Sequence, residues 1–127
     1  MKLEKLQILL QRSWDKDTSH YKDWKPANPA YGQCAVTALV VQDYLGGDII
    51  SCFVGKFRHY YNDTHDKNEI DLTASQYDPF VPYYEQCKIV DRKQLLLNLD
   101  VNGIKLCRNW KSKFLKQTLR FELILNY

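Results

Sequence analysis

The sequence lacks a hydrophobic run long enough to cross a membrane, because no stretch approaches the roughly 20 consecutive apolar residues that a spanning helix needs. The N-terminal segment MKLEKLQILLQRSW contains only the short apolar run Leu6–Leu10 and no small-residue cleavage site, so it is not a signal peptide. We therefore expect a soluble, cytoplasmic protein with no membrane partner.

The sequence also lacks a strong excess of charge of either sign. The formal net charge is +3, and the lysines and arginines are interspersed with acidic residues. The lysine-rich segment 105–116 is interpreted as a solvated helix face. Nothing in this balance points to nucleic acid as a partner.

The sequence has only four cysteines and no CxxC pair, so a structural zinc site has little support. Without an export signal, we expect reduced thiols rather than disulfides. Cys52 lies in the apolar run Ile49–Val54 and is predicted to be a core residue. Cys87 and Cys107 have no local feature that marks them out and are interpreted as structural.

Repeats, low-complexity segments and linkers are absent, so we expect residues 1–127 to form one α+β domain with its own core. Leucines at helical spacing predict a first helix over residues 3–12. Residues 13–31 form a long, irregular stretch with two prolines and four large aromatic residues. Because loops of this length are usually functional or disordered, and aromatic residues argue against disorder, we expect this stretch to form one wall of a cleft.

A buried helix is predicted over Cys34–Leu45, since its residues are apolar almost all round and Gly46-Gly47 supplies a stop. Cys34 is its first residue. The first N–H groups of a helix lack intrahelical partners and the helix dipole favours negative charge there, so both effects stabilise a thiolate. Cys34 is therefore the candidate nucleophile.

Three strands are predicted from β-branched residues and alternation: 49–54, 57–62 and 69–72. The last two should form an antiparallel hairpin around a polar turn. If this hairpin is symmetric about His65, His59 lies opposite Asp71, with Cβ atoms ~4.5–5.5 Å apart. A slip by one residue would place Asp71 on the other face of the sheet.

The rest of the chain is predicted as a helical turn at Ala74–Tyr77 capped by Thr73, an extended segment at 84–90, a helix at 91–98 capped by Asp91, a turn at 99–103 and a helix at 104–116. The tail, 117–125, fits either a strand or a helix, and a helix is favoured.

These residues predict a Cys-His-Asp triad. His59 would take the proton of Cys34 and later protonate the leaving group, and Asp71 would orient the imidazole. The side-chain amide of Gln33 or the backbone N–H of Cys34 would face the oxyanion. The reaction would pass through an acyl-enzyme thioester on an amide, peptide or acyl substrate, and it needs no cofactor.

Other polar and aromatic residues are candidates for the surrounding cleft: Trp24, Asn62 and Gln76. His20 and His65 lie in polar stretches and are expected to be exposed to solvent. His65 would replace His59 as the base if the predicted hairpin register were wrong.

Three motifs follow one another at short spacing: GQCAVTALVVQDYLGGDI, HYYN and EIDLTASQY. Together they cover roughly Trp24–Tyr77 and resemble the YunG-like family of small bacterial proteins. That family typically shows HYWN, so Tyr61 stands here in place of a tryptophan, a change that preserves the candidate triad but can alter the cleft. The resemblance implies no particular activity.

More remotely, a cysteine at a helix start followed by histidine and aspartate on successive strands resembles the transglutaminase-like and papain-like cysteine enzymes. This resemblance implies an α+β fold in which a buried central helix, beginning at the nucleophile, packs on a small antiparallel sheet. It also implies Cys34 as nucleophile, His59 as base and Asp71 as orienter, in a thiol hydrolase or acyltransferase.

Two alternatives stay open. The chain could be a non-catalytic module that binds a small molecule or peptide in an aromatic cleft formed by Trp14, Trp24, Tyr60 and Tyr61. A less favoured alternative places a metal ion between the three triad residues, because three ligands and a water suit catalytic zinc. Our prediction remains the enzyme, with no metal.

Overall fold

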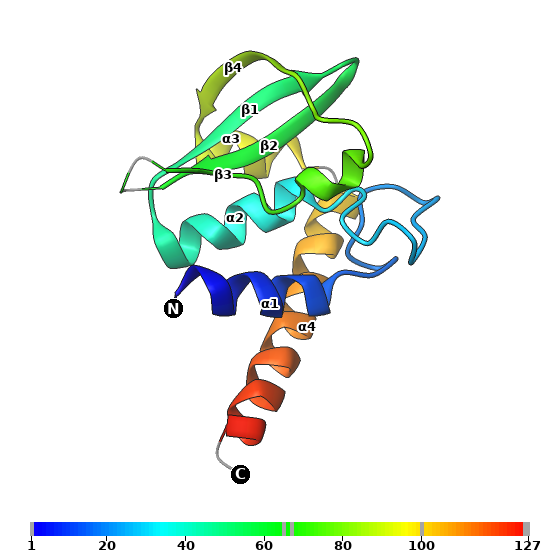
Figure 1. Ribbon diagram of the computed structural model, residues 1–127, viewed down its shortest axis with the longest axis vertical. Helices are drawn as coiled ribbons and strands as arrows, with labels where there is room; N and C mark the ends of the chain where they lie inside the picture. Colours follow the sequence, from blue (N-terminus) through cyan, green and yellow to red (C-terminus); the bar gives the residue numbers. More distant parts are fainter. Residues whose placement is uncertain (1, 65, 67, 100, 126–127) are drawn as a thin grey trace.

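The computed structural model describes residues 2–64, 66, 68–99 and 101–125. The chain is an α+β protein with one small antiparallel sheet (Figure 1). In order, its elements are α1 (Leu3–Ser13), α2 (Cys34–Leu45), β1 (Asp48–Val54), β2 (Phe57–Asp63), β3 (Glu69–Ile70), the 3-10 helix η1 (Ala74–Tyr77), β4 (Tyr84–Val90), α3 (Arg92–Asn98) and α4 (Val101–Leu125).

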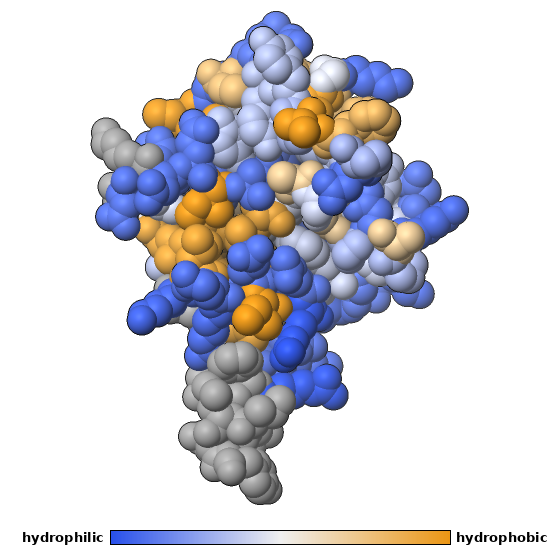
Figure 2. Space-filling model, viewed as in Figure 1, coloured by the Kyte–Doolittle hydropathy of each residue, from blue (hydrophilic) through white to orange (hydrophobic). Residues whose placement is uncertain are grey.

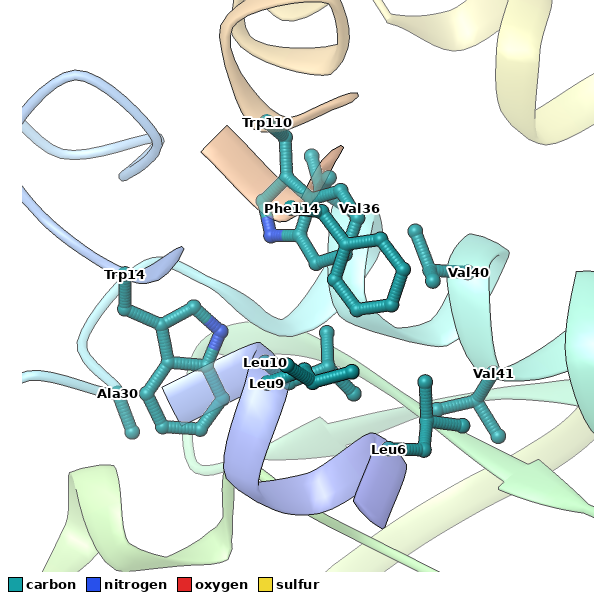
Figure 3. Packing of buried hydrophobic residues seen from close by; sticks show 10 residues of the cluster. All are labelled: Leu6, Leu9, Leu10, Trp14, Ala30, Val36, Val40, Val41, Trp110 and Phe114. Carbon is teal, nitrogen blue, oxygen red and sulfur yellow. The ribbon is translucent and has the colours of Figure 1, made fainter. Parts of the chain in front are cut away.

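The main core lies where α1, α2 and α4 meet, below the sheet in the view of Figure 1. Each helix contributes one apolar stripe, and the loop after α1 closes one end (Figure 3). The buried members are Leu6, Leu9, Leu10, Trp14, Ala30, Val36, Val40, Val41, Trp110 and Phe114. Trp110 is only 1% exposed, so α4 packs into this core around Trp110 and Phe114.

Helix α2 is central because it packs on both sides. Its residues Val36–Val41 are all buried, which confirms the predicted buried helix. One side faces the core of Figure 3, and the other packs on the sheet and α3 through Ala38 and Leu39. The helix ends at Gly46, which has a positive φ of 70°, as the Gly-Gly stop predicted.

The sheet has the strand order β3-β2-β1-β4, and all neighbours are antiparallel. The predicted hairpin of β2 and β3 exists, but its register was wrong by two residues. Asn62 pairs with Ile70 and Asp63 with Glu69, and β3 ends at Ile70 rather than at residue 72. A shift of two preserves the side-chain faces, so Asp71 still reaches His59, from a diagonal position just beyond the strand.

Several local predictions need correction. Helix α4 begins at Val101, so Gly103 lies inside a helix where a turn was predicted; the packing of Trp110 and Phe114 outweighs the ~1 kcal/mol that glycine costs in a helix. Asp100 lies outside the described residues. The tail to Leu125 is helical, as favoured. Thr73 and Asp91 occupy N-cap positions, but neither makes a side-chain capping bond.

The visible surface mixes polar and apolar side chains over most of the face in Figure 2. Within the part of the chain that the structure describes, no helix combines the length and apolar character needed to cross a bilayer.

Candidate active site

Cys34 stands at the first position of α2, where the preceding loop turns sharply. Gly32 makes this turn with a φ of +76°, and a Cβ there would lie 2.2 Å from Ser19 Oγ. Its carbonyl accepts a hydrogen bond from the backbone N–H of His20, which fixes the loop against the helix start. The Cys34 side chain is partly exposed and its thiol is free. Only glycine fits this turn, so the local sequence itself determines how Cys34 is presented.

His59 is fully buried on β2 inside a cage of tyrosines. Tyr61 and Tyr84 stack on its ring at centroid distances of 6.3 and 5.7 Å, and Tyr77 meets it edge-on at 5.3 Å. Its Nε2 atom lies 2.7 Å from Oδ2 of Asp71. The tyrosine rings fix the orientation of the imidazole, and its Nε2 atom is hydrogen-bonded to the carboxylate of Asp71.

Asp71 is held by three neighbours. Besides His59, it accepts hydrogen bonds from the Tyr84 hydroxyl and from both the backbone N–H and the hydroxyl of Thr73. Burial by itself raises the pKa of Asp71, but the bonds from His59, Tyr84 and Thr73 outweigh it and hold the pKa below its usual value. The carboxylate is therefore ionised and fixed in position at neutral pH.

The surroundings of His59 favour the charged form of its imidazole. Burial by itself lowers the pKa of His59, but Asp71 and the nearby Cys34 side chain outweigh it and raise the pKa from 6.5 to about 9. The second ring nitrogen, Nδ1, is buried with no well-aligned hydrogen-bond partner among the described residues. Contacts between a nucleophile and its base are often poorly aligned before substrate binds. Cys34, His59 and Asp71 thus lie together, as predicted.

Two hollows adjoin Cys34. The larger has a volume of about 240 Å³, and its lining comprises His20, Tyr21, Gly32, Cys34, Ala35, Arg58, Tyr60, Leu95 and Leu99. The smaller has a volume of about 140 Å³ and is lined mainly by aromatic rings: Tyr21, Tyr31, Phe57 and Tyr77, with Cys34, Arg58 and Gln76. Because Cys34, Tyr21 and Arg58 belong to both linings, the thiol lies at the junction of the two spaces.

The loop before α2 forms a wall of both hollows, as predicted, but through other aromatic residues than the two tryptophans. Tyr21 and Tyr31, stacked at 4.7 Å, line the smaller hollow. Trp14 is a core residue whose Nε1 donates to Thr37, and Trp24 Nε1 donates to the carbonyl of Pro29. Both tryptophans serve the packing of the loop and are absent from the lining of either hollow.

Of the other predicted cleft residues, Gln76 lines the smaller hollow and Tyr60 lines the larger one. Gln33 is fully buried and its side-chain amide donates to the carbonyl of Asp15, so it is not directed at Cys34. The backbone N–H of Cys34 remains the predicted oxyanion donor. Asn62 is also buried, and its amide donates to the Ala38 carbonyl, which ties β2 to α2.

The Asn62 contact leads to a stability prediction. Asn62→Ala should lower the free energy of unfolding by about 1–3 kcal/mol, because the Ala38 carbonyl would lose its buried donor. Urea unfolding followed by circular dichroism measures this. Asn28→Ala is the matched control, since its amide bond to the Gln76 carbonyl is only partly buried and should matter less. Equal effects of the two substitutions would contradict a buried structural role for Asn62.

Two site residues were missed by the sequence analysis. Tyr84 donates to Asp71 and stacks on His59, but it enters from β4, whose pairing with β1 contains an irregularity that no local pattern predicts. Arg58 lies next to His59 on β2 and lines both hollows. The alternation of side chains along β2 could have indicated this role, because it places His59 on one face of the strand and the cation Arg58 on the other.

Of the other two histidines, His20 is exposed, as predicted, and lines the larger hollow beside Cys34, whereas His65 lies outside the described residues. Cys52 is a fully buried core thiol, and burial raises its pKa to about 12. Cys87 is exposed and free, while the side chain of Cys107 is not described. Within the described ranges, no group of three or more His, Cys, Asp or Glu is arranged to hold a metal ion.

The fold and the site define an α+β protein with a Cys-His-Asp side-chain cluster at the start of a buried helix. The family described as YunG protein matches residues 2–103, and the chain belongs to this family. It is similar to the uncharacterized protein YunG of Bacillus subtilis strain 168, with 35% identity over 81 residues, which is 64% of this chain and 68% of that protein. No solved structure matches.

Proposed function

We propose that this protein is a cysteine-dependent hydrolase or acyltransferase that acts on an amide or thioester through Cys34, His59 and Asp71. The observation that carries the proposal is the 2.7 Å contact between His59 and an ionised Asp71, with the opposite ring nitrogen buried and Cys34 near enough to raise the pKa of the imidazole. A nucleophile, a base and an orienting carboxylate in series are the parts that thiol catalysis requires.

In the proposed reaction, His59 holds the proton of Cys34 and the thiolate sulfur attacks the substrate carbonyl carbon. The tetrahedral oxyanion accepts hydrogen bonds from backbone N–H groups at the start of α2, including that of Cys34. His59 then gives its proton to the leaving group as the C–N or C–S bond breaks. Water or an amine, deprotonated by His59, attacks the thioester and regenerates the thiol.

A papain-like or transglutaminase-like architecture is part of the same proposal. It is supported by a buried helix that begins at the nucleophile and packs on an antiparallel sheet that carries the histidine. Fold-level analogy alone is weak support for function, so the proposal depends on the site.

The first experiment compares two thiols in one sample. Cys34, although only partly exposed, should react with iodoacetamide at pH 7 at least tenfold faster than the exposed Cys87, because a thiolate is the reactive species. Site-resolved mass spectrometry at short reaction times measures both rates. Cys34→Ala should remove the fast site and leave Cys87 unchanged. A Cys34 slower than Cys87 in the folded protein would overturn the enzyme proposal and favour a binding role for the aromatic hollow.

A further inference from the structure

The side chain between the two hollows is a cation. Arg58 lies on β2 next to His59, on the opposite face of the strand, and it lines both hollows together with Cys34 and Tyr21. Its Nη1 donates to Ser51 Oγ at 2.7 Å, and its guanidinium lies 4.4 Å from the Phe53 ring centroid. These two contacts restrict the position of the side chain without neutralising its charge.

Among the residues that the structure describes, no carboxylate lies within ion-pair distance of Arg58, whereas Arg92 and Lys113 each pair with aspartates. With Nη1 on Ser51, other N–H donors of the guanidinium remain for a ligand. A planar guanidinium presents such donors in a geometry that matches a carboxylate.

The residues around Arg58 indicate which other chemical groups the substrate would carry. The smaller hollow has aromatic walls, from Tyr21, Tyr31, Phe57 and Tyr77, and suits an apolar group. The lining of the larger one includes Arg58 and Tyr60 together with the apolar side chains of Leu95 and Leu99. A molecule whose reacting carbonyl rests at Cys34 would extend into both spaces, with Arg58 beside the reacting bond.

We propose that the substrate carries a carboxylate close to the scissile bond and that Arg58 binds it, with an apolar group of the substrate in the aromatic hollow. This inference rests on the proposed function, because it uses Cys34 as the reacting atom. Arg58 would be a specificity-determining residue, which holds one end of the substrate while Cys34, His59 and Asp71 carry out the reaction.

Two alkylating reagents of similar size, one anionic and one neutral, test this proposal. Iodoacetate and iodoacetamide both react with a thiolate by forming a C–S bond as the C–I bond breaks and iodide leaves, but only iodoacetate carries a carboxylate. The readout is the ratio of their rates at Cys34, divided by the same ratio at Cys87. Arg58→Gln should lower this normalised ratio about fivefold, the factor expected for losing an attraction to a charge about 4 Å away.

Controls separate Arg58 from the general charge of the site. The imidazolium of His59 also attracts iodoacetate, but it is present in both proteins and cancels. Lys56→Gln removes an exposed lysine from the β1–β2 turn and should leave the ratio unchanged. Arg58→Lys keeps a charge but loses the planar donors, so it should fall between wild type and Arg58→Gln.

The outcomes distinguish the two proposals. If Cys34 reacts rapidly with neutral iodoacetamide in the wild type but Arg58→Gln leaves the normalised ratio unchanged, the carboxylate inference is wrong and the enzyme proposal stands. If Cys34 reacts with iodoacetamide more slowly than Cys87, the enzyme proposal is wrong. The carboxylate inference, which rests on it, is then wrong as well. An equal fall of the ratio in Lys56→Gln and Arg58→Gln would also overturn the role given to Arg58.

Discussion

Replacing His59 with glutamine should slow iodoacetamide alkylation of Cys34 at pH 6 by about 100-fold. A thiol with the ordinary pKa of about 8.5 is only roughly 0.3% thiolate at this pH. In the proposed mechanism, the imidazolium of His59, whose pKa is about 9, holds the proton of Cys34 in the wild type. The reaction is measured by site-resolved mass spectrometry, with Cys87 as the internal reference.

The pH profile gives a second readout that loss of packing alone would not produce. In the wild type the Cys34 rate should be nearly flat between pH 6 and pH 8, because the pKa of His59 is about 9 and the imidazolium stays charged throughout. In His59→Gln it should rise about tenfold per pH unit, as for an ordinary thiol. Circular dichroism of the variant must match the wild type, because His59 is fully buried. Parallel profiles in the two proteins would refute a thiolate–imidazolium pair.

Replacing Asp71 with asparagine should lower the free energy of unfolding by about 3 kcal/mol at pH 6. The pKa of His59 rises from 6.5 to about 9 on folding, and part of this rise comes from Cys34, so the figure is an upper value. Because the folded-state pKa is the higher one, this stabilisation is fully present below pH 6.5 and is lost as the pH rises through 9. The pKa of Asp71 is lowered on folding, so Asp71 stabilises the folded protein at pH values above its ordinary pKa. This stabilisation is lost as the pH falls into the acid range.

The difference between wild type and Asp71→Asn should therefore be largest between about pH 4 and pH 6.5 and should shrink toward pH 9. Urea unfolding at pH 5, 6, 7.5 and 9 measures it. Asp43→Asn is the matched control, because Asp43 pairs with Arg92 at 2.8 Å but both side chains are more than a third exposed. That change should cost less than about 1 kcal/mol with no trend over this range. A pH-independent loss in Asp71→Asn would show that Asp71 serves packing alone.

The hairpin shows where reading the sequence succeeds and where it stops. Alternation along β2 placed His59 and Tyr61 on one face, and the parity of the hairpin placed Asp71 within reach of His59. The register itself was wrong by two residues, because the actual turn depends on backbone conformations that the polar segment 63–68 does not determine. The site survived the error, since a shift of two keeps every side chain on its face.

The glutamine and the tryptophans show a different limit. Gln33 was expected to face the oxyanion and Trp24 to line the cleft, and the alternative binding module placed Trp14 in its aromatic cleft as well. Their hydrogen bonds instead go to Asp15, Thr37 and Pro29, which close the loop on itself and on α2. Which way a side chain in an irregular loop points is decided by the packing of the whole loop, and no short-range period predicts it.

By itself, the sequence determined the α+β class, the buried helix that starts at Cys34, and the three residues of the candidate triad. These follow from local physics: a glycine-permitted turn, a helix with apolar residues all round, and alternation along a strand. Only the tertiary structure decided that Tyr84 from β4 holds Asp71, that α4 completes the core, and that Arg58 lies between two hollows at Cys34. Each of these joins elements far apart in the chain, whose meeting depends on how the whole core packs rather than on any neighbouring residue.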